Sequence, residues 1–338
     1  MTSVHIVIPD LFLPKQLAAY IGTDLHLPAL EKLLAMGRSE ALNIDSPEAL
    51  LCKEFGMGDN SIAPITLLGD GIEPGSFYWL RADPVGVSMQ RDQITLQSDI
   101  SLGADEAARL CESMNTHFAA DGLQFYAPHP QRWYLRLEQA PAIQTVPLPQ
   151  VVGANMHEYL PVGEDALHWH SVSNEIQMLF HDHTVNLARE HAGRQQVNGV
   201  WFWGGGNFQL NLPKLYAGVM GGSDLARAFA KAAGLPVLNK IKTNPYGREE
   251  DQGDLLLVYE QLRHCMQSAD IGNWRKAMQL FEREYAEPLL GLMKASSVER
   301  LTLDVLGENT SRRFTLTPDA LWKIWRKPRP LFHYALDK

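Results

Sequence analysis

The sequence predicts an α/β fold in which helices cover both faces of a doubly wound sheet, with a smaller α+β domain inserted. Strand-like hydrophobic runs alternate with helical periodicity over most of the 338 residues, as in sheets of this class. Between Gly71 and Pro161 the pattern changes to short alternating runs around one helix. We therefore expect residues 1–70 and 162–338 to form the core and residues 71–161 the inserted domain.

The core elements follow one another along the chain with recognisable boundaries. In the first helix, Leu30, Leu33 and Leu34 share one face and Gly37 is a stop signal. The expected core elements are the strand Val4–Ile8, the helices Leu27–Gly37 and Pro47–Phe55, the helix Ser173–Ala192, the strand Gly199–Trp203, a helix that starts near Ser223, the strand Leu255–Tyr259, the helix Trp274–Lys294 and the strand Leu301–Val305.

The inserted segment is predicted to form a small sheet beside one amphipathic helix. The helix Asp105–Ala120 carries apolar residues at i, i+3, i+4 and i+7 spacing. The Pro-rich segment Pro141–Pro149 is expected to connect the insert back to the core. The expected strands of the insert are Phe77–Arg81, Gln93–Leu96 and Arg132–Leu137.

Composition restricts the class of protein. Hydrophobic residues make up 45% and charged residues 20%, and no run approaches the roughly 18 apolar residues of a membrane span. The chain enters its first strand without the pattern of a secretory signal, so we expect a cytoplasmic protein with no membrane partner. Three cysteines without CxxC spacing indicate reduced thiols.

Charge argues against nucleic acid as a partner. The net charge is -9, whereas binding to phosphates requires a basic surface. One basic cluster, Lys323–Arg329 with Trp322 and Trp325, is short and interrupted by prolines. We interpret it as a solvated C-terminal element, with contact to RNA or an acidic partner as the alternative.

The run Asn198–Gly206 ends in three consecutive glycines, Gly204, Gly205 and Gly206. A glycine loop there would let backbone N–H groups approach an anionic ligand. The same glycines would equally serve a tight chain reversal against Trp201 and Trp203. The residues alone leave both interpretations open.

Two residues suggest chemistry at the edge of the sheet. Asp10 directly follows the first strand, where open α/β sheets bind ligands, and Ser46 begins a helix. Ser46 is either an N-cap or a nucleophile, and capping is the simpler interpretation. No histidine stands at an obvious position to accept its proton, so a nucleophilic Ser46 would need a metal.

Several motifs resemble those of the archaeal-type cofactor-independent phosphoglycerate mutases of the alkaline phosphatase superfamily. The most specific are His183–Arg189 followed by Asn198–Gly206, and Leu27–Gly37, Leu80–Asp83 and Gln131–Leu135 agree in order. The resemblance implies an alkaline-phosphatase-like core with an inserted domain. The chain also closely resembles a bacterial branch described as RpfE-type regulatory proteins.

Members of this family transfer a phosphoryl group through a serine beside two divalent metal ions. The resemblance places Asp10 at the first metal ligand and Ser46 at the nucleophile, although Leu11 and Pro47 depart from the family pattern. The remaining ligand positions fall near His264 and Ser268, and near Glu308 and Asn309. These donors are too few for two cations, and Asp10, His264 and Glu308 would hold a single ion at most.

We therefore expect a phosphoglycerate-mutase-like binding or regulatory protein without catalytic activity and without a cofactor. Its ligand would be a phosphorylated or carboxylate small molecule, and a protein partner is also expected. The alternative is an active mutase or phosphatase that uses Mn, Mg or Zn and Ser46 as nucleophile. The candidate ligand contacts are Arg81, Arg132, Asn186, Arg189, Asn198, Gly204, Gly205 and Gly206. For each arginine, a structural salt bridge is the alternative role.

Overall fold

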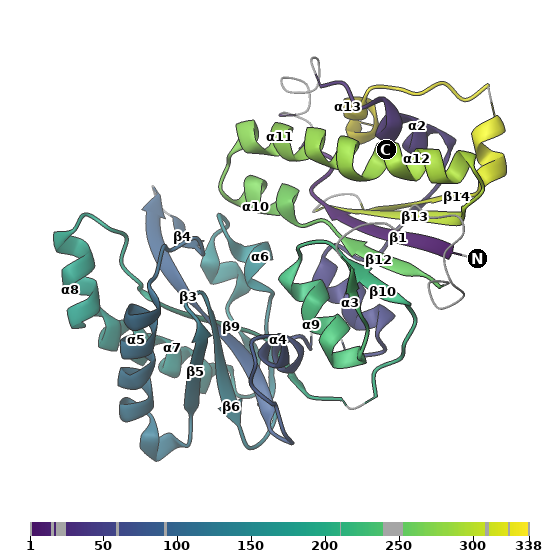
Figure 1. The fold of residues 1–338 in the computed structure, drawn as a ribbon. Helices are drawn as coiled ribbons and strands as arrows, with labels where there is room; N and C mark the ends of the chain where they lie inside the picture. Colours follow the sequence, from purple (N-terminus) through teal and green to yellow (C-terminus); the bar gives the residue numbers. More distant parts are fainter. Residues whose placement is uncertain are drawn as a thin grey trace. The chain divides into compact units, whose positions relative to one another are not determined.

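The chain folds into two compact units, shown as a computed structural model in Figure 1. Unit 1 comprises Met1–Gly56 and Leu212–Lys338, and unit 2 comprises Met57–Asn211. The structure describes residues 2–14, 17, 25–58, 61–90, 93–209, 211–238, 253–307, 311–323 and 325–336.

A mostly parallel sheet forms the centre of unit 1. β1 pairs in parallel with β12 on one side and β13 on the other, whereas β14 runs antiparallel to β13 and β2 antiparallel to β14. This order confirms the predicted α/β class. Within the described residues the strands are, in spatial order, β11 (Val237–Leu238), β10 (Gly218–Met220), β12 (Leu255–Val258), β1 (Thr2–Pro9), β13 (Val298–Leu306), β14 (Arg312–Leu316) and β2 (Arg38–Ala41).

Helices cover both faces of this sheet (Figure 1). One face packs against α2 (Pro28–Met36), α11 (Ile271–Phe281) and α12 (Glu287–Lys294), and the apolar side chains of these elements form one core with Ile6 and Ile8 of β1. The other face carries α3 (Pro47–Glu54) and α9 (Asp224–Ala233). The shorter elements of unit 1 are α10 (Gln261–Gln267), the 3-10 helix η5 (Pro318–Trp322) and α13 (Leu331–Leu336).

The predicted helix Trp274–Lys294 contains a π-helical turn, η4 (Glu282–Ala286), between α11 and α12. This turn directs the Glu282 carboxylate at the start of α2, where it accepts hydrogen bonds from the backbone N–H groups of Ala29 at 2.6 Å and Leu30 at 3.0 Å. Leu27, the N-cap residue of α2, has no side chain that can accept these bonds. Glu282 therefore satisfies N–H groups that a helix start leaves without intrahelical partners.

An antiparallel sheet forms the centre of unit 2. β3 is long enough to pair with β4, β6 and β9 along its length. Its alternating side chains pack on both faces, with Leu80 in the larger core and Trp79 against α4. The strands are β3 (Tyr78–Gln90), β4 (Gln93–Gln97), β5 (Gln124–His129), β6 (Arg132–Leu137) and β9 (Gly199–Asn207), with a separate pair β7 (Ile143–Gln144) and β8 (Val162–Gly163).

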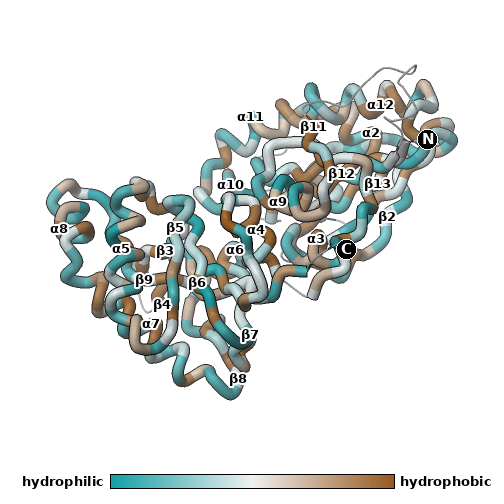
Figure 2. Tube along the Cα trace, turned by 60° about the horizontal axis from the view of Figure 1, so that its bottom comes forward, coloured by the Kyte–Doolittle hydropathy of each residue, from teal (hydrophilic) through white to brown (hydrophobic). Residues whose placement is uncertain are grey.

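The helices of unit 2 are amphipathic and flank this sheet. In Figure 2 the tube of α5 alternates between hydrophobic and hydrophilic residues, as expected of a helix with one buried face. The helices are α4 (Ala63–Gly69), α5 (Ala104–His117), α6 (Leu148–Val151), α7 (Ala166–His181) and α8 (Thr184–His191), with the 3-10 turns η1 (Ala119–Asp121) and η2 (Met156–Tyr159).

The boundary between the units differs from the expected one. Residues 57–70 and 162–211, which we expected in the core, lie in unit 2. The reason is long-range pairing: β9 runs antiparallel to β3, and α4 and α7 pack against these strands. The inserted unit therefore comprises Met57–Asn211 rather than residues 71–161.

The expected helix Ser173–Ala192 is two helices, α7 and α8. The break falls at His183, whose Nδ1 accepts a hydrogen bond from the backbone N–H of Val185 and caps α8. Periodicity alone missed this break because His183 continues the apolar spacing of α7. Within the described residues, no helix is both long and apolar enough to cross a lipid bilayer.

Gly204, Gly205 and Gly206 lie inside β9 and do not form a loop after it. The register shifts between Trp79 and Arg81 of β3, and Gly204 has a φ of +66°, as in a β-bulge that starts with glycine. A Cβ on Gly206 would lie 2.7 Å from Cβ of Ser61. These glycines are therefore needed for close packing around a strand irregularity.

Candidate functional site

Arg263 lies among carboxylates where β1 and β12 of unit 1 end. Its Nη1 is 2.8 Å from Oε1 and 3.1 Å from Oε2 of Glu48, and 3.8 Å from Oε1 of Glu260. The side chains of Arg263, Glu48 and Glu260 are only 10%, 6% and 13% exposed. The structure therefore places the guanidinium of Arg263 between two buried carboxyl groups.

Three helix starts bring these side chains together. Glu48 lies in the first turn of α3, and Glu260 is the N-cap residue of α10, three residues before Arg263. Ser223 caps α9 by accepting from the N–H of Ala226, and its hydroxyl donates to Oε2 of Glu260 at 2.5 Å. We call Ser46, Glu48, Ser223, Glu260 and Arg263, together with Asp10, the Arg263 cluster.

The charges in the Arg263 cluster shift one another's ionisation. Burial lowers the pKa of Arg263, but Glu48 and Glu260, with a contribution from Asp10, outweigh burial and raise it. Burial raises the pKa of Glu260, Glu48 raises it further, and Arg263 opposes the rise. The guanidinium of Arg263 thus stays charged at this buried position.

Two residues predicted from the sequence are related to this pair: Ser46 stands two residues before Glu48, and the negative charge of Asp10 acts on Arg263. The Oγ of Ser46 accepts a hydrogen bond from the N–H of Ala49 at 3.3 Å, so Ser46 is the N-cap of α3. It is 1% exposed. Asp10 follows β1 with a φ of +56°, a conformation that few residues other than glycine adopt. Its carbonyl accepts from Nε1 of Trp274 at 3.0 Å.

The residues of this edge do not fit a pair of divalent metal ions. Glu48 and Glu260 already neutralise Arg263, and His264 lies on the exposed side of α10. Glu308 lies outside the described residues. In the part of the chain that the structure describes, no group of three His, Cys, Asp or Glu side chains is arranged to hold a metal ion.

Glu48, Glu260 and Arg263 were not among the residues predicted from the sequence. One signal was present: Glu260 and Arg263 stand three apart at the start of a helix that directly follows a hydrophobic strand, and such residues lie on the same helix face. Their partner Glu48 is 215 residues away from Arg263, and no local pattern predicts that contact.

A second buried network lies within unit 1. Nε2 of His5 is 2.7 Å from Oδ2 of Asp304, and Nδ1 of His5 is 2.9 Å from the hydroxyl of Tyr216. Arg313 donates to both carboxylate oxygens of Asp304, and Tyr216 donates to Glu54. Burial raises the pKa of Asp304, but hydrogen bonds from Arg313 and His5 outweigh burial and lower it. This network joins β1, β13 and β14 to the end of α3.

In unit 2, Arg81 and Arg132 each pair with a carboxylate. Arg81 donates to both oxygens of Asp83 and lies 5.3 Å from the ring centroid of Tyr134 and 5.2 Å from that of Trp203. Arg132 pairs with Asp70, and Tyr134 also donates to Asp70 at 2.6 Å. Burial raises the pKa of Asp70, but Arg132 and Tyr134 outweigh burial and lower it. Arg132 is more exposed, with 23% of its side chain accessible, than Arg81.

Arg189, Asn186 and Asn198 make their contacts elsewhere in unit 2. Arg189 pairs with Glu106 at 2.8 Å and donates to the carbonyls of Ser101 and Gln195. The Asn186 amide bonds to the carbonyls of Phe180 and Val197 and accepts from the N–H of Val197. Oδ1 of Asn198 accepts from the N–H of Val87. These residues hold the chain segment that enters β9, and the predicted role of all three in ligand binding stays a prediction.

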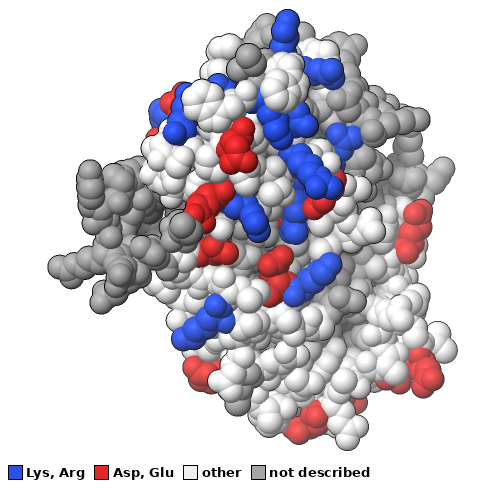
Figure 3. All heavy atoms as spheres, turned by 90° about the vertical axis from the view of Figure 1, so that its right-hand side faces the viewer, with Lys and Arg blue, Asp and Glu red and all other residues white. Residues whose placement is uncertain are grey.

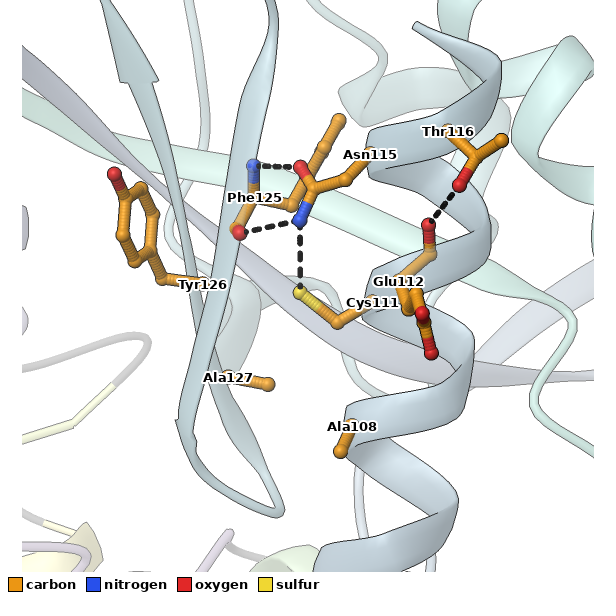
Figure 4. A pocket seen from close by; sticks show the side chains of 8 residues that line it. All are labelled: Ala108, Cys111, Glu112, Asn115, Thr116, Phe125, Tyr126 and Ala127. Atoms are coloured by element: carbon orange, nitrogen blue, oxygen red, sulfur yellow. Dashed lines mark hydrogen bonds between the residues drawn. The ribbon is translucent and has the colours of Figure 1, made fainter. Parts of the chain in front are cut away.

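A surface hollow of about 490 Å³ lies between α5 and β5 of unit 2 (Figure 4). Asn115 crosses it and forms two hydrogen bonds with the backbone of Phe125, so it occupies the free edge of β5. Cys111 lines the hollow, and burial raises the pKa of its thiol to about 12. A thiol that stays protonated at neutral pH is a poor nucleophile, which argues against catalysis there.

The basic segment near the C-terminus is partly structural. Nη1 of Arg326 donates to the carbonyls of Ala35, Met36 and Gly37 at the end of α2, with 2.9 Å to Gly37. Trp322 and Trp325 are strongly exposed. In the view of Figure 3, Lys and Arg side chains gather in the upper part of the visible surface, with Asp and Glu side chains among them.

The chain resembles known proteins in sequence and in fold. No known protein family profile matches the chain. In sequence it is 24% identical over 317 residues to the 2,3-bisphosphoglycerate-independent phosphoglycerate mutase of Methanosarcina barkeri, which covers 82% of this chain and 77% of the relative. It is 23% identical over 350 residues to the enzyme of the same name from Methanosarcina mazei, which covers 92% and 84%.

Two solved structures cover nearly the whole chain. The PH0037 protein from Pyrococcus horikoshii aligns with a TM-score of 0.51 at 12% identity over 93% of this chain and 87% of that one. A cofactor-independent phosphoglycerate mutase from Thermoplasma acidophilum aligns with a TM-score of 0.43 at 16% identity, covering 94% and 90%. The fold assignment rests on the first of these.

The chain has an α/β fold with a second unit inserted into the first, and it shares its fold with a solved structure over most of its length. Its sequence is weakly similar to cofactor-independent phosphoglycerate mutases over most of its length.

Proposed function

We propose that this chain is a phosphoglycerate-mutase-like protein that has lost two-metal phosphoryl transfer and now serves in ligand binding and regulation. The proposal includes the regulatory role that the resemblance to the bacterial RpfE-type branch implies. It also keeps the expectation of a cytoplasmic protein that works without a cofactor.

The proposal rests on two properties of the Arg263 cluster: its glutamates are paired with Arg263, and Ser46 is buried. A two-metal site requires ionised donors that are free to face two cations, whereas Glu48 and Glu260 share the guanidinium of Arg263. A nucleophile must also reach its substrate, whereas Ser46 is 1% exposed and its Oγ caps α3. Both observations favour loss of the reaction over an atypical version of it.

The ligand is proposed to be a phosphorylated or carboxylate small molecule. Of the three candidate arginines, Arg132 has the most accessible side chain, at 23%, whereas Arg189 is almost completely buried. Arg132 is therefore the best candidate for an anion contact, with Asp70 released when the anion binds. Titration with 3-phosphoglycerate, followed by calorimetry, tests this, and Arg132→Ala should abolish the heat of binding.

The proposal of lost catalysis has a direct test. Purified protein is assayed for phosphoglycerate interconversion and phosphatase activity with Mn²⁺, Mg²⁺ or Zn²⁺, beside a Ser46→Ala variant. We expect no turnover above the level of the variant. Turnover that the Ser46→Ala change abolishes would contradict the proposal.

An active mutase or phosphatase is the second candidate function. It is favoured by the names of the sequence relatives, whose matches cover 77% and 84% of their lengths. In that case Ser46 would carry the phosphoryl group and Asp10 would be a metal ligand. The same Ser46→Ala assay separates the two functions.

A further inference from the structure

We propose that Trp322 and Trp325 form, with Lys327 and Arg329, a docking surface for an acidic segment of a partner protein. We call these four residues the Trp322 patch. The docking surface rests on the regulatory part of the proposed function and adds the chemistry of a partner to it. None of the four residues belongs to the Arg263 cluster.

Both tryptophans of the patch are strongly exposed. Trp322 ends the 3-10 helix η5 and is 80% exposed, and Trp325, three residues later, is 74% exposed. Tryptophan is highly buried on average, because its side chain carries a large apolar area. Two neighbouring indoles in water are therefore unfavourable, and a partner that covers them gains from their burial.

The segment that carries the patch is fixed to unit 1 at several points. Ala320 of η5 is buried, and Nη1 of Arg326 donates to the carbonyl of Gly37 at 2.9 Å. The N–H of Leu331 donates to Oε1 of Glu31 at 3.1 Å. The patch thus lies between anchored residues, which reduces the entropy that binding would remove.

The patch is basic, although the whole chain has a net charge of -9. Lys327 and Arg329 are exposed, and each stands next to a proline, which restricts the backbone. The sequence has no Asp or Glu between Asp319 and Asp337. Charge complementarity therefore favours carboxylates on the partner, which a guanidinium can bind through two parallel hydrogen bonds.

A protein segment fits these features better than a nucleic acid or a membrane does. A nucleic acid would bring a long polyanion against a chain that is itself strongly acidic. Proteins commonly lie on a membrane through an amphipathic helix, whereas η5 and α13 have only five and six residues. Tryptophan and arginine are among the residues that most often dominate the binding energy of protein interfaces.

The test begins with a phage library of random dodecapeptides. The library is depleted on Trp322→Ala/Trp325→Ala, and binders are then selected on full-length wild type. We expect enriched peptides that combine several Asp or Glu residues with an aromatic or large apolar residue. The most enriched peptide, labelled with fluorescein, is titrated with each protein by fluorescence anisotropy. It should bind Trp322→Ala/Trp325→Ala at least about tenfold more weakly than wild type.

Charge and matched controls complete the design. Lys327→Glu/Arg329→Glu should also weaken peptide binding at least about tenfold, because it reverses the charge that the carboxylates meet. Arg283→Glu and Leu167→Ala/Met178→Ala change exposed side chains elsewhere. Both should bind the peptide within about twofold of wild type. An unchanged Tm shows that each variant is folded.

Several results would overturn the proposal. One is a selection that yields no peptide able to distinguish wild type from Trp322→Ala/Trp325→Ala, and another is a set of enriched peptides without acidic residues. Binding of oligouridylate, of phosphatidylserine vesicles or of a second copy of the chain through the two tryptophans, with no selected peptide bound, would assign the patch to a different partner. Failure of the proposed function has a separate readout, which is turnover by wild type that Ser46→Ala abolishes.

Discussion

Nη1 of Arg263 lies within hydrogen-bonding distance of both carboxylate oxygens of Glu48, at 2.8 and 3.1 Å, and so joins α10 to α3. The two residues are 215 positions apart, and both side chains are at most 10% exposed. A buried pair of this kind gains Coulomb energy but loses the hydration of two ions. Its contribution to stability therefore depends on both partners being present.

A double-mutant cycle at this pair measures that dependence. Arg263→Met leaves Glu48 and Glu260 buried without their cation, and we expect it to reduce the free energy of unfolding by about 3–5 kcal/mol. Arg263→Met/Glu48→Leu removes one of the stranded charges and should recover part of this loss. Urea unfolding measures both, and Arg283→Met, a change at an exposed arginine, should stay within about 0.5 kcal/mol. A double variant no more stable than Arg263→Met would contradict the expectation.

The Asp304 network predicts a pH-dependent stability. Although burial raises the pKa of Asp304, hydrogen bonds from Arg313 and His5 outweigh burial and bring the pKa below the ordinary aspartate value of 3.8. The folded state therefore binds fewer protons than the unfolded state, so this contribution is present above pH 3.8 and is lost as pH falls through the folded pKa. At neutral pH, Asp304→Asn should reduce the free energy of unfolding by about 3–5 kcal/mol.

Urea unfolding of wild type and Asp304→Asn between neutral pH and pH 3 tests this sign. The difference between the two proteins should shrink in the acid range, because wild-type Asp304 then becomes protonated in the unfolded chain. Asp319→Asn, at an exposed carboxyl, serves as the control. A difference that grows as pH falls would show that the sign is wrong.

Local patterns predicted the elements that depend on local interactions. The strand Val4–Ile8 appears as β1 (Thr2–Pro9), and the helix Pro47–Phe55 appears as α3 (Pro47–Glu54). The hydrophobic run that predicts β1 lies within one segment. The N-cap and the proline that predict the start of α3 are likewise adjacent in the sequence. Such signals need no knowledge of partners distant in the chain.

The assignment of β9 to unit 2 could not be predicted in this way. A hydrophobic strand between helices has the same appearance whether it joins a parallel core sheet or pairs antiparallel with β3. The partner of β9 lies more than a hundred residues earlier, as the pair Val85 and Gly199 shows. The Arg263–Glu48 contact escaped prediction for the same reason. The Arg81–Asp83 pair was missed for a different one: the expected strand ended at Arg81, whereas β3 continues through Asp83 and so places both side chains on one face.

Arg81 provides a test of what a guanidinium does in unit 2. It donates three hydrogen bonds to Asp83 and lies close to the rings of Tyr134 and Trp203. Lysine keeps the charge but loses the planar fork and the stacking. Arg81→Lys should therefore reduce the free energy of unfolding by about 2–4 kcal/mol, since one buried carboxylate loses most of its partners.

The matched control for this change is Arg194→Lys, at a half-exposed arginine that pairs with Glu106. It should change stability by less than about 1 kcal/mol. Thermal and urea unfolding compare the two variants with wild type. If Arg81→Lys unfolds like Arg194→Lys, the planar contacts of Arg81 contribute little, and its burial needs another explanation.

Gly206 tests whether the glycines of β9 are required by packing. A Cβ at this position would lie 2.7 Å from Cβ and 3.3 Å from Cα of Ser61, so either the segment just before α4 or β9 must move. Gly206→Ala should reduce the free energy of unfolding by about 1–3 kcal/mol, as overpacking does elsewhere. Gly222→Ala is the control, because a Cβ there meets no atom within 4 Å and the backbone is not left-handed. Equal stability of the two variants in urea unfolding would mean that the glycines are not kept for packing, which would favour the earlier alternative of a backbone contact to an anionic ligand.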